Sequence, residues 1–244
     1  MVIGSVIIVV LFILALFHPS AVAGGGISST TKYLIWGNFT QVSTRSFGNE
    51  TQIYYISWYG CPIGAADSWA FYIALKQLGN VSAYVTPHYS DPYDSAPNTP
   101  GLLFASTIQL PGVHFQSYYL YNEFLNVSSN GIVLNKANTV SVGLNELKLS
   151  LPANIYEMEY EAMQTIPTEG LSGAQPPVAS AVTLNHVNTN VIVTGPFGAW
   201  ILNGPLYSPA VLQGLNSTAL LSSATHNTAI LHASETVVSV LNSS

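Results

Sequence analysis

The sequence predicts an α/β fold, and three observations carry this prediction. A strand, a turn and a long helix follow one another between Ile53 and Gly79. A second strand pair followed by a helix begins near Val191, and helical patterns follow from Ser217. The chain has 244 residues, of which 48% are hydrophobic, so it can fill a core. We therefore expect one domain with elaborations, or two small domains.

Residues 27 to 52 predict an edge strand ahead of the first helix. Tyr33-Leu34-Ile35-Trp36 is a run of residues that favour β-structure, and Gly37-Asn38 and Gly48-Asn49 favour turns. An α/β sheet built on the next unit can take such a strand at its edge.

The stretch from Ile53 to Gly79 predicts a buried strand followed by a helix that begins at Cys61. Gly60 ends the strand, and Pro62 favours a helix start, because the first helical turn needs no N–H from that residue. Gly79 is placed to cap the helix. One face is predicted to lie in the core, whereas Asp67, Lys76 and Gln77 lie off it. The core face comprises Ala66, Trp69, Ala70, Ile73, Ala74 and Leu78.

This unit resembles the active-site corner of the thioredoxin superfamily, in which a cysteine lies at a helix N-terminus. More narrowly, the run from Cys61 to Trp69, with Ala74-Leu75 and Gly79, resembles an archaeal and actinobacterial thioredoxin-like family of uncharacterised function, domain of unknown function 929. A second block resembles the C-terminal part of that family: Pro196-Phe197, Asn203-Gly204, Tyr207-Ser208-Pro209 and Leu212-Gln213-Gly214-Leu215. Relatives carry Cys-Pro-Tyr-Cys, whereas Gly64 stands at the second cysteine position here.

The resemblance implies a thioredoxin-like fold and a cis-proline that precedes a core strand and faces the cysteine. Pro196 is the candidate for this proline, and Pro100 is the rival. Pro196 is preferred because the predicted strand, turn and helix follow it in the expected order.

Between the two blocks, Val81 to Thr86 predicts a strand parallel to the first one, and Pro87 to Pro100 a loop. Short strands are predicted at residues 102–104 and 113–120, with a hairpin around Pro111-Gly112. Ile132 to Leu151 alternates apolar and polar residues over part of its length, and Ile155 to Gln164 predicts an acidic helix. We expect residues 101 to about 188 to be a β-rich or irregular insertion in the thioredoxin-like core.

The second half begins with the strand Val191-Ile192-Val193-Thr194 and continues with Phe197 to Leu202. Asn203-Gly204 predicts the turn of a strand pair. Ser208 is predicted to cap a helix that begins at Pro209. Ser217 to Ser223 and Asn227 to Leu241 predict a helical C-terminus that packs on the core.

Charged residues make up only 7% of the chain, against roughly 25% in ordinary soluble domains. The formal net charge is -6, and the five Lys and Arg residues never cluster, which argues against a nucleic-acid partner or an anionic membrane surface. So few ionisable groups predict that stability depends only weakly on pH, which suits an acidic extracellular habitat.

The N-terminus predicts export. Val2 to Phe17 is an uninterrupted apolar segment, expected to form a hydrophobic helix of about 24 Å, somewhat short of a hydrocarbon core of about 30 Å. Residues 1–23 are thus either a signal peptide cleaved after Ala21-Val22-Ala23 or a retained anchor that contacts the membrane through residues 2–17. Residues 24–30 are predicted to be a flexible linker, and residues 31–244 the thioredoxin-like ectodomain. The mature protein is expected to be extracytoplasmic, either anchored or secreted.

Asn-x-Ser/Thr sequons agree with export and predict N-glycosylation. A chain this rich in Asn, Ser and Thr would contain several by chance, but we expect some to carry glycan. They begin at Asn38, Asn49, Asn80, Asn126, Asn216 and Asn242.

Cys61 is the one residue with a sharp chemical interpretation. A cysteine at a helix N-terminus is expected to have a pKa below about 8.5 and to act as a nucleophile. The alternative is an inherited cysteine without a catalytic role, because Gly64 removes the resolving thiol. Asp67, two turns along the helix, is the nearest acidic residue that could relay a proton, but a solvated position or a backbone hydrogen bond is the preferred explanation. The histidines lack metal-ligand spacing and no cofactor motif is present, so neither a metal nor a cofactor is expected.

From the sequence we expect a thioredoxin-like ectodomain that acts as a non-catalytic binding, accessory or structural module at the cell surface. Its partner would be a protein or a surface assembly. The alternative hypothesis is a monothiol thiol-disulfide oxidoreductase that uses Cys61, and the question of enzymatic activity stays open at this point.

Overall fold

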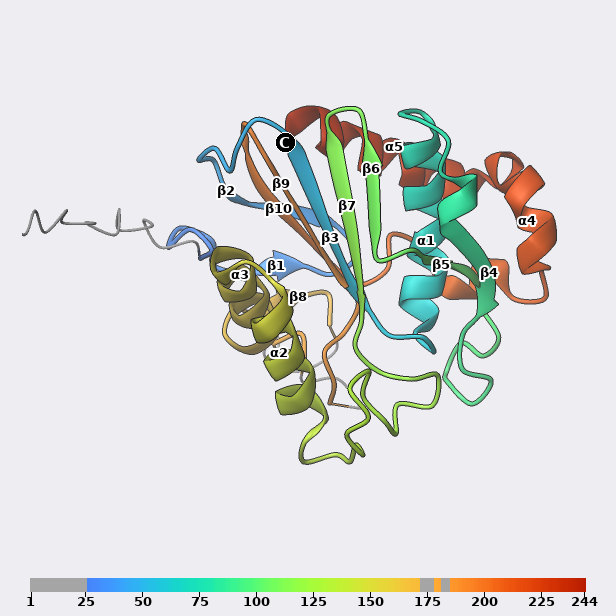
Figure 1. Cartoon of the computed structure of the whole chain (residues 1–244), viewed down its shortest axis with the longest axis horizontal. Coiled ribbons are helices and arrows are strands. Elements are labelled where there is room, and N and C mark those ends of the chain that lie inside the picture. The colour runs from blue at the N-terminus through green and yellow to red at the C-terminus, as the bar shows by residue number, and fades with distance from the viewer. Residues whose placement is uncertain (1–25, 172–177, 181–184) are drawn as a thin grey trace, which may run out of the picture.

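The computed structural model describes residues 26–171, 178–180 and 185–244. It is a mixed α/β fold built on a central sheet with helices on both faces, in agreement with the predicted class (Figure 1). Only β3 and β7 pair in parallel in this sheet, and all other neighbours pair antiparallel. The strand order is β2 (Phe39–Ser43), β10 (Gly198–Asn203), β9 (Asn190–Gly195), β3 (Thr51–Ser57), β7 (Val113–Tyr119) and β6 (Thr107–Leu110).

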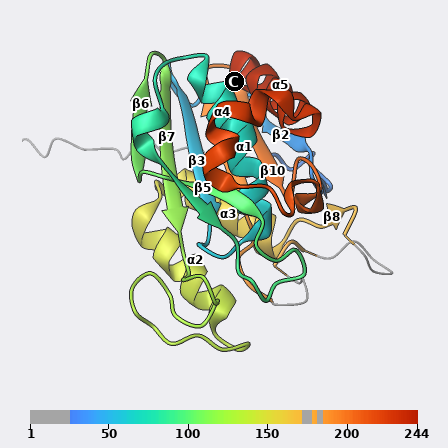
Figure 2. The ribbon, with the colours of Figure 1, turned by 90° about the vertical axis from the view of Figure 1, so that its right-hand side faces the viewer.

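The helices divide between the two faces of the sheet. The first face is covered by α1 (Pro62–Lys76) and α5 (Thr228–Ser243), and the second by α2 (Thr139–Ser150) and α3 (Ala153–Gln164). Side chains alternate along β3, so that Ile53 and Tyr55 join the first core, whereas Tyr54 and Ile56 join the second. Figure 2 looks onto the side of α1, where α4 (Ser217–Ser223) and α5 lie in front of the sheet.

The predicted helix α1 is confirmed, but its predicted polar face is only partly correct. Residues Gly64 to Leu75 are all buried, because β5 and α5 cover the side of α1 that the sheet leaves open. Asp67 is 0% exposed, which corrects the prediction that it lies off the core, whereas Lys76 and Gln77 are exposed as predicted. The helix ends at a cap formed by Gln77 rather than Gly79.

The prediction of a parallel strand at Val81–Thr86 is wrong. Residues 82–84 form a 3-10 turn, and β4 (Val85–Tyr89) pairs antiparallel with β5 (Pro100–Phe104) in a separate two-stranded sheet. Gly101 of β5 crosses α1 so closely that a Cβ atom there would lie 2.5 Å from Ala65 Cα. This small sheet therefore packs on α1, and β7 takes the parallel position beside β3.

The predicted insertion begins too early, because β7 lies within residues 101–188 and belongs to the central sheet. The hairpin at Pro111-Gly112 is confirmed, with β6 and β7 as its strands. The segment after β7 carries α2 and α3, so Ile132 to Leu151 is partly helical and the acidic helix is confirmed. It also carries β8 (Thr168–Glu169), which pairs in parallel with β1 (Leu34–Ile35).

Residues 27–52 do supply an edge strand of the central sheet, β2 next to β10, but the predicted run Tyr33–Trp36 contains β1, which lies in a separate sheet instead. The predicted strand pair in the second half is also confirmed, but its turn lies at Pro196-Phe197, and Asn203-Gly204 instead ends β10. The helix predicted at Pro209 is only a 3-10 turn, Pro209–Leu212, and the Ser208 side chain does not cap it. The C-terminal helices α4 and α5 lie where predicted.

The predicted signal peptide or anchor, residues 1–23, and the first two residues of the predicted linker, 24 and 25, lie outside the described residues. Within the residues that are described, no helix has the length and apolar character needed to cross a membrane.

Candidate functional site

Cys61 lies between the end of β3 and the start of α1, as the sequence predicted. Its backbone is extended (φ -68°, ψ 117°), and its sulfur accepts a hydrogen bond from the backbone N–H of Gly64 at 3.4 Å. Pro62 occupies the first helical position. Cys61 is only 4% exposed. The thiol therefore caps the helix from a buried position.

A short chain of hydroxyl groups continues from the thiol into the protein. Cys61 Sγ lies 3.0 Å from Thr189 Oγ1, which lies 2.8 Å from Ser57 Oγ. All three side chains are buried. Thr189 immediately precedes β9, so the antiparallel pairing of β9 with β3 brings it to the end of β3 where the cysteine sits.

The assignment of Pro196 as a cis-proline facing Cys61 is wrong. The described residues contain no cis peptide bond, so the rival Pro100 is excluded as well. Pro196 lies in the turn after β9, at the other end of that strand from Thr189. Six residues of strand separate two such positions by about 20 Å. Thr189, rather than the predicted Pro196, therefore lies opposite the cysteine. In the sequence, only the position of Thr189 directly before β9 points to this placement, because its residue type does not.

The pKa of Cys61 is shifted in the opposite direction from the prediction. Burial raises the pKa of the thiol, because a thiolate would lose its hydration, and the Asp94 carboxylate adds to the rise. Hydrogen bonds from Gly64, Thr189 and Ile63 lower the pKa but do not outweigh burial. Cys61 is therefore a neutral thiol at pH 7.

Gly64 is enclosed by the hydroxyl groups around the thiol. A Cβ atom at this position would lie 2.2 Å from Ser57 Oγ and 3.1 Å from Thr189 Oγ1. The carbonyl of Gly64 is held as well, since it accepts a hydrogen bond of 2.6 Å from Tyr55 Oη. The space that a second cysteine would need is thus filled by Ser57.

Beside Cys61 lies a cavity of about 330 Å³ with a mainly apolar lining. We call it the Cys61 cavity. Helix α1 contributes Pro62 and Ile63 to its wall, and the remaining wall comes from Trp36, Trp58, Asp94, Ser95, Ala96, His186, Asn188, Pro205 and Pro209. Segments far apart in the sequence therefore meet at the N-terminus of α1.

Two side chains of this wall carry buried polar atoms without a partner. Trp58 is 2% exposed and His186 is 7% exposed, and neither Trp58 Nε1 nor His186 Nδ1 has a hydrogen-bond partner among the described residues. The two rings meet edge to face, with centroids 5.8 Å apart. Burial lowers the pKa of His186 to about 4, so its ring is neutral near pH 7. No motif in the sequence indicates a role for His186.

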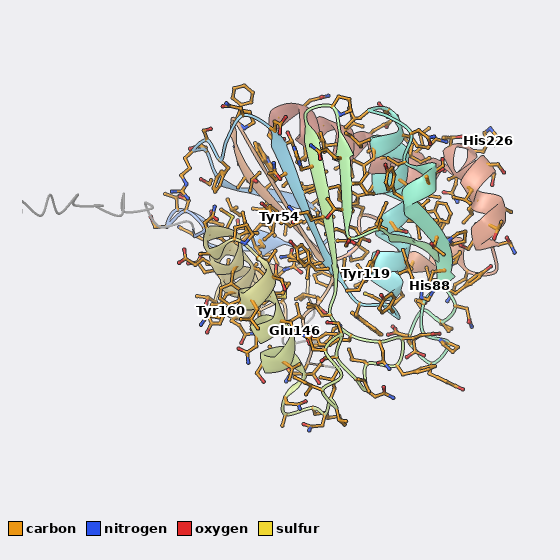
Figure 3. All side chains as sticks on the ribbon, in the orientation of Figure 1. Tyr54, His88, Tyr119, Glu146, Tyr160 and His226 are labelled. Atoms are coloured by element: carbon orange, nitrogen blue, oxygen red, sulfur yellow. The ribbon has the colours of Figure 1, made fainter. Side chains whose placement is uncertain are left out.

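Tyr59, next to Trp58, lies outside the Cys61 cavity. It is 41% exposed, and its ring stacks on Tyr119 at 5.1 Å. The imidazole of His88 meets the Tyr59 carbonyl oxygen at 2.8 Å. Figure 3 labels His88 and Tyr119 on this side of the molecule. Tyr59 therefore belongs to an aromatic surface contact.

Asp67 is hydrogen-bonded to the segment that forms part of the cavity wall. Its Oδ1 accepts a hydrogen bond of 2.9 Å from the backbone N–H of Leu206, next to the cavity residue Pro205. Burial raises the pKa of this carboxyl well above its usual range. The backbone hydrogen bond, one of the two predicted explanations for Asp67, is the one observed.

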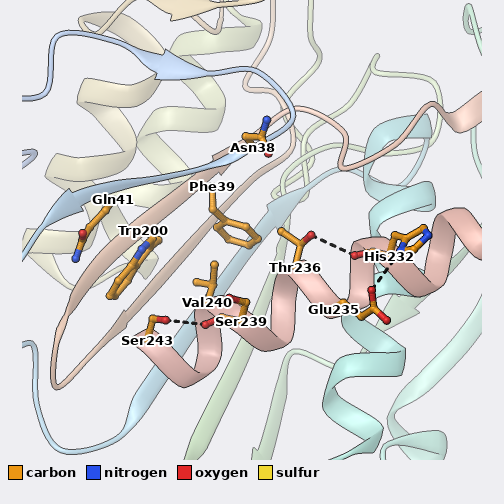
Figure 4. Close-up of a pocket in the computed structure, with 10 residues that line it drawn as sticks. All are labelled: Asn38, Phe39, Gln41, Trp200, His232, Glu235, Thr236, Ser239, Val240 and Ser243. Carbon is orange, nitrogen blue, oxygen red and sulfur yellow. Dashed lines mark hydrogen bonds and ion pairs between the residues drawn. The ribbon is translucent and has the colours of Figure 1, made fainter.

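A larger and more open groove, about 680 Å³, lies between β2, β10 and α5 (Figure 4). Its polar side chains mostly bond within α5: Thr236 donates to the His232 carbonyl, Ser243 to the Ser239 carbonyl, and His232 pairs with Glu235. No unpartnered buried polar atom among the described residues lies on its wall. The smaller Cys61 cavity is therefore the stronger candidate site.

The remaining predicted positions lie on the surface. All six sequon asparagines are exposed, so each can be reached by a glycosylating enzyme. No group of three or more His, Cys, Asp or Glu residues in the described part of the chain is arranged to hold a metal ion.

Comparison with known proteins gives one match. Residues 38–243 match the family described as "Domain of unknown function (DUF929)". No curated protein and no solved structure matches the chain. The matched range contains Cys61, Thr189 and every residue of the Cys61 cavity except Trp36.

Proposed function

The chain belongs to the DUF929 family, and we propose that it is an exported, non-catalytic binding module of thioredoxin-like fold, with the Cys61 cavity as its binding site. The fold proposal is supported by the strand order β7, β3, β9, β10 with one parallel pair, and by the cysteine that opens α1 directly after β3. The pairing of α1 with the C-terminal helix α5 on one face supports it further.

The observation that carries the functional proposal is the state of the thiol. Cys61 is buried, its pKa is raised, and it is the only cysteine of the 244 residues. A thiolate that attacked a disulfide would release one thiolate and remain in a mixed disulfide until a second thiol attacked it. Ser57 fills the space of that second thiol at position 64. A buried thiol with a raised pKa and no second thiol beside it is more consistent with a residue of the cavity wall than with a nucleophile.

A monothiol oxidoreductase is the alternative, and the position of Cys61 at the helix N-terminus favours it. Hydrogen bonds from Gly64, Thr189 and Ile63 all lower the thiol pKa. Alkylation distinguishes the two hypotheses. We expect iodoacetamide to react with Cys61 more slowly in the folded protein than in urea at every pH between 6 and 9, since burial disfavours the thiolate. Thr189→Val should slow the reaction further, because it removes a hydrogen bond that stabilises the thiolate.

Substitution of the cysteine completes this test. Cys61→Ser is expected to keep the fold, with a change of stability within about 1.5 kcal/mol for a near-isosteric exchange, measured by urea unfolding. It should also preserve the protein's role in its native cell. A thiol pKa below about 7, as in activated cysteines, together with loss of that role in Cys61→Ser, would establish the oxidoreductase instead.

Export to the cell surface is supported by the exposed sequons and the low charge content. We expect intact-mass and glycopeptide mass spectrometry of the natively produced protein to detect glycan on at least one sequon. Asn216 offers a matched variant, since its side chain caps α4 by accepting from Ala219 N–H. Thr218→Ala removes the sequon and keeps this cap, so it should leave Asn216 without glycan and should not reduce stability. Six unmodified asparagines in the native protein would refute the glycosylation proposal.

A further inference from the structure

Trp58 and His186 set the chemical requirement of the Cys61 cavity. A buried polar atom without a partner is unfavourable, because it has given up hydrogen bonds to water and gained none. Trp58 Nε1 and His186 Nδ1 are both in this condition, and both side chains line the same cavity. A bound molecule that supplies their partners would remove this cost.

The two side chains require different partners. The indole N–H of Trp58 can only donate, so it needs an acceptor. The neutral ring of His186 has one donor and one acceptor nitrogen, so it can pair with an N–H group. A ligand with a hydrogen-bond acceptor next to an N–H group would satisfy both.

The charge in the cavity restricts the ligand further. Asp94 is the one charged residue of the wall, and its carboxylate raises the pKa of both Cys61 and His186, so its negative field reaches the interior. An anion would be repelled by this field and would lose its hydration against an apolar wall. A cation such as an amidinium lacks the acceptor that Trp58 needs.

We propose that the Cys61 cavity binds an uncharged amide group, whose carbonyl oxygen accepts from Trp58 Nε1 and whose N–H donates to His186. The apolar wall formed by Ile63, Pro205 and Pro209 would hold the apolar body attached to that amide. This inference rests on the proposed binding function and names the class of its ligand.

Three probes of one shape but different charge test the inference: benzamide, benzoate and benzamidinium. The readout is the set of indole N–H signals of the four tryptophans in ¹⁵N-labelled protein. We expect benzamide to shift the Trp58 signal in a saturable way, and the two charged probes to bind at least 10-fold more weakly. The Trp69 signal serves as an internal control, because its N–H already donates to the Pro100 carbonyl at 2.8 Å.

A variant pair assigns the effect to the hydrogen bond. Trp58→Phe keeps an aromatic ring and removes the donor, so benzamide affinity should fall about 3- to 10-fold, as for one neutral hydrogen bond. Trp200→Phe, whose side chain lines the other groove, should leave the affinity unchanged. If Trp58→Phe does not fold, the probe titrations on the unchanged protein decide.

The source of the amide is tested in the same way, with N-acetylalanine methylamide as a peptide probe. Preference for benzamide indicates a small carboxamide, preference for the peptide probe indicates a polypeptide segment, and either supports an amide ligand. The inference would be overturned if benzoate bound as tightly as benzamide, or if no probe changed the Trp58 signal. If the amide inference fails but Cys61 is alkylated slowly, the non-catalytic hypothesis still stands. Fast alkylation of Cys61 would count against the non-catalytic hypothesis and not against the amide inference.

Discussion

Glu159→Gln is expected to make the folded protein more stable than the wild type, with a difference that grows as the pH rises. Glu159 is 0% exposed, and burial raises its pKa to about 8, from 4.5 for a solvated glutamate. Below pH 4.5 the folded and unfolded states are both protonated. Between 4.5 and 8 only the unfolded state ionises, which favours unfolding by about 1.4 kcal/mol per pH unit. The variant lacks this penalty, which reaches about 5 kcal/mol above pH 8.

The contacts of Glu159 explain why a proton belongs there. The side-chain amide of Asn190 donates to Glu159 Oε2, while Glu159 Oε1 and Asn190 Oδ1 both lack a partner. A proton on Oε1 would let it donate to Asn190 Oδ1, which completes a two-bond acid–amide pair. The amide of a glutamine at 159 can form the same pair. Asn190 follows Thr189, so this pair also supports the residue that contacts Cys61.

Urea unfolding of both proteins from pH 4 to 9 measures the effect. Asp67 acts in the same direction as Glu159, and His186 acts in the opposite direction between pH 6.5 and about 4. Both groups are present in wild type and variant, so the difference between the two curves isolates Glu159. Glu157→Gln, at an exposed position on the same helix, is the control for the exchange itself, and its difference from the wild type should stay smaller than that of Glu159→Gln. Parallel curves for the wild type and Glu159→Gln would contradict a protonated Glu159.

Gly64→Ala and Gly64→Cys are expected to destabilise the protein by about 2–4 kcal/mol, through overpacking and the loss of a buried hydrogen bond. The new Cβ atom would meet Ser57 Oγ at 2.2 Å and disturb its contact with Thr189. Helix propensity alone predicts the opposite sign, since alanine stabilises a helix by about 1 kcal/mol relative to glycine. Thermal and urea unfolding therefore separate the two effects by sign.

A compensating variant identifies the cause. Ser57→Ala removes the oxygen atom that meets the new Cβ, so Ser57→Ala combined with Gly64→Ala should lose less stability than the two single variants together. Strict additivity, or a Gly64→Ala variant as stable as the wild type, would show that position 64 has room for a side chain. Restoring a second cysteine at 64 is therefore expected to damage the site before it can create a two-thiol enzyme.

The expected pH dependence rests on a feature that the number of charged residues does not reveal. Few charged residues predict weak pH dependence, and the count itself is correct. The acidic helix containing Glu159 was also predicted at the right place. Its sequence does not show that Asn190 and the back of the sheet enclose one of its carboxyl groups. Enclosure by residues distant in sequence, rather than the number of charges, sets the size of this effect.

The sequence by itself determined the local units of this protein. The strand that ends before Gly60, the helix that starts at Cys61-Pro62, the hairpin at Pro111-Gly112 and the C-terminal helices follow from signals within a few residues of each other. Only the tertiary structure decided that β7 pairs with β3, that Asp67 is buried, and that Thr189 faces Cys61 from 128 positions away. Strand pairing, burial and the thiol pKa depend on long-range packing. A local sequence pattern does not encode which distant segment packs against it.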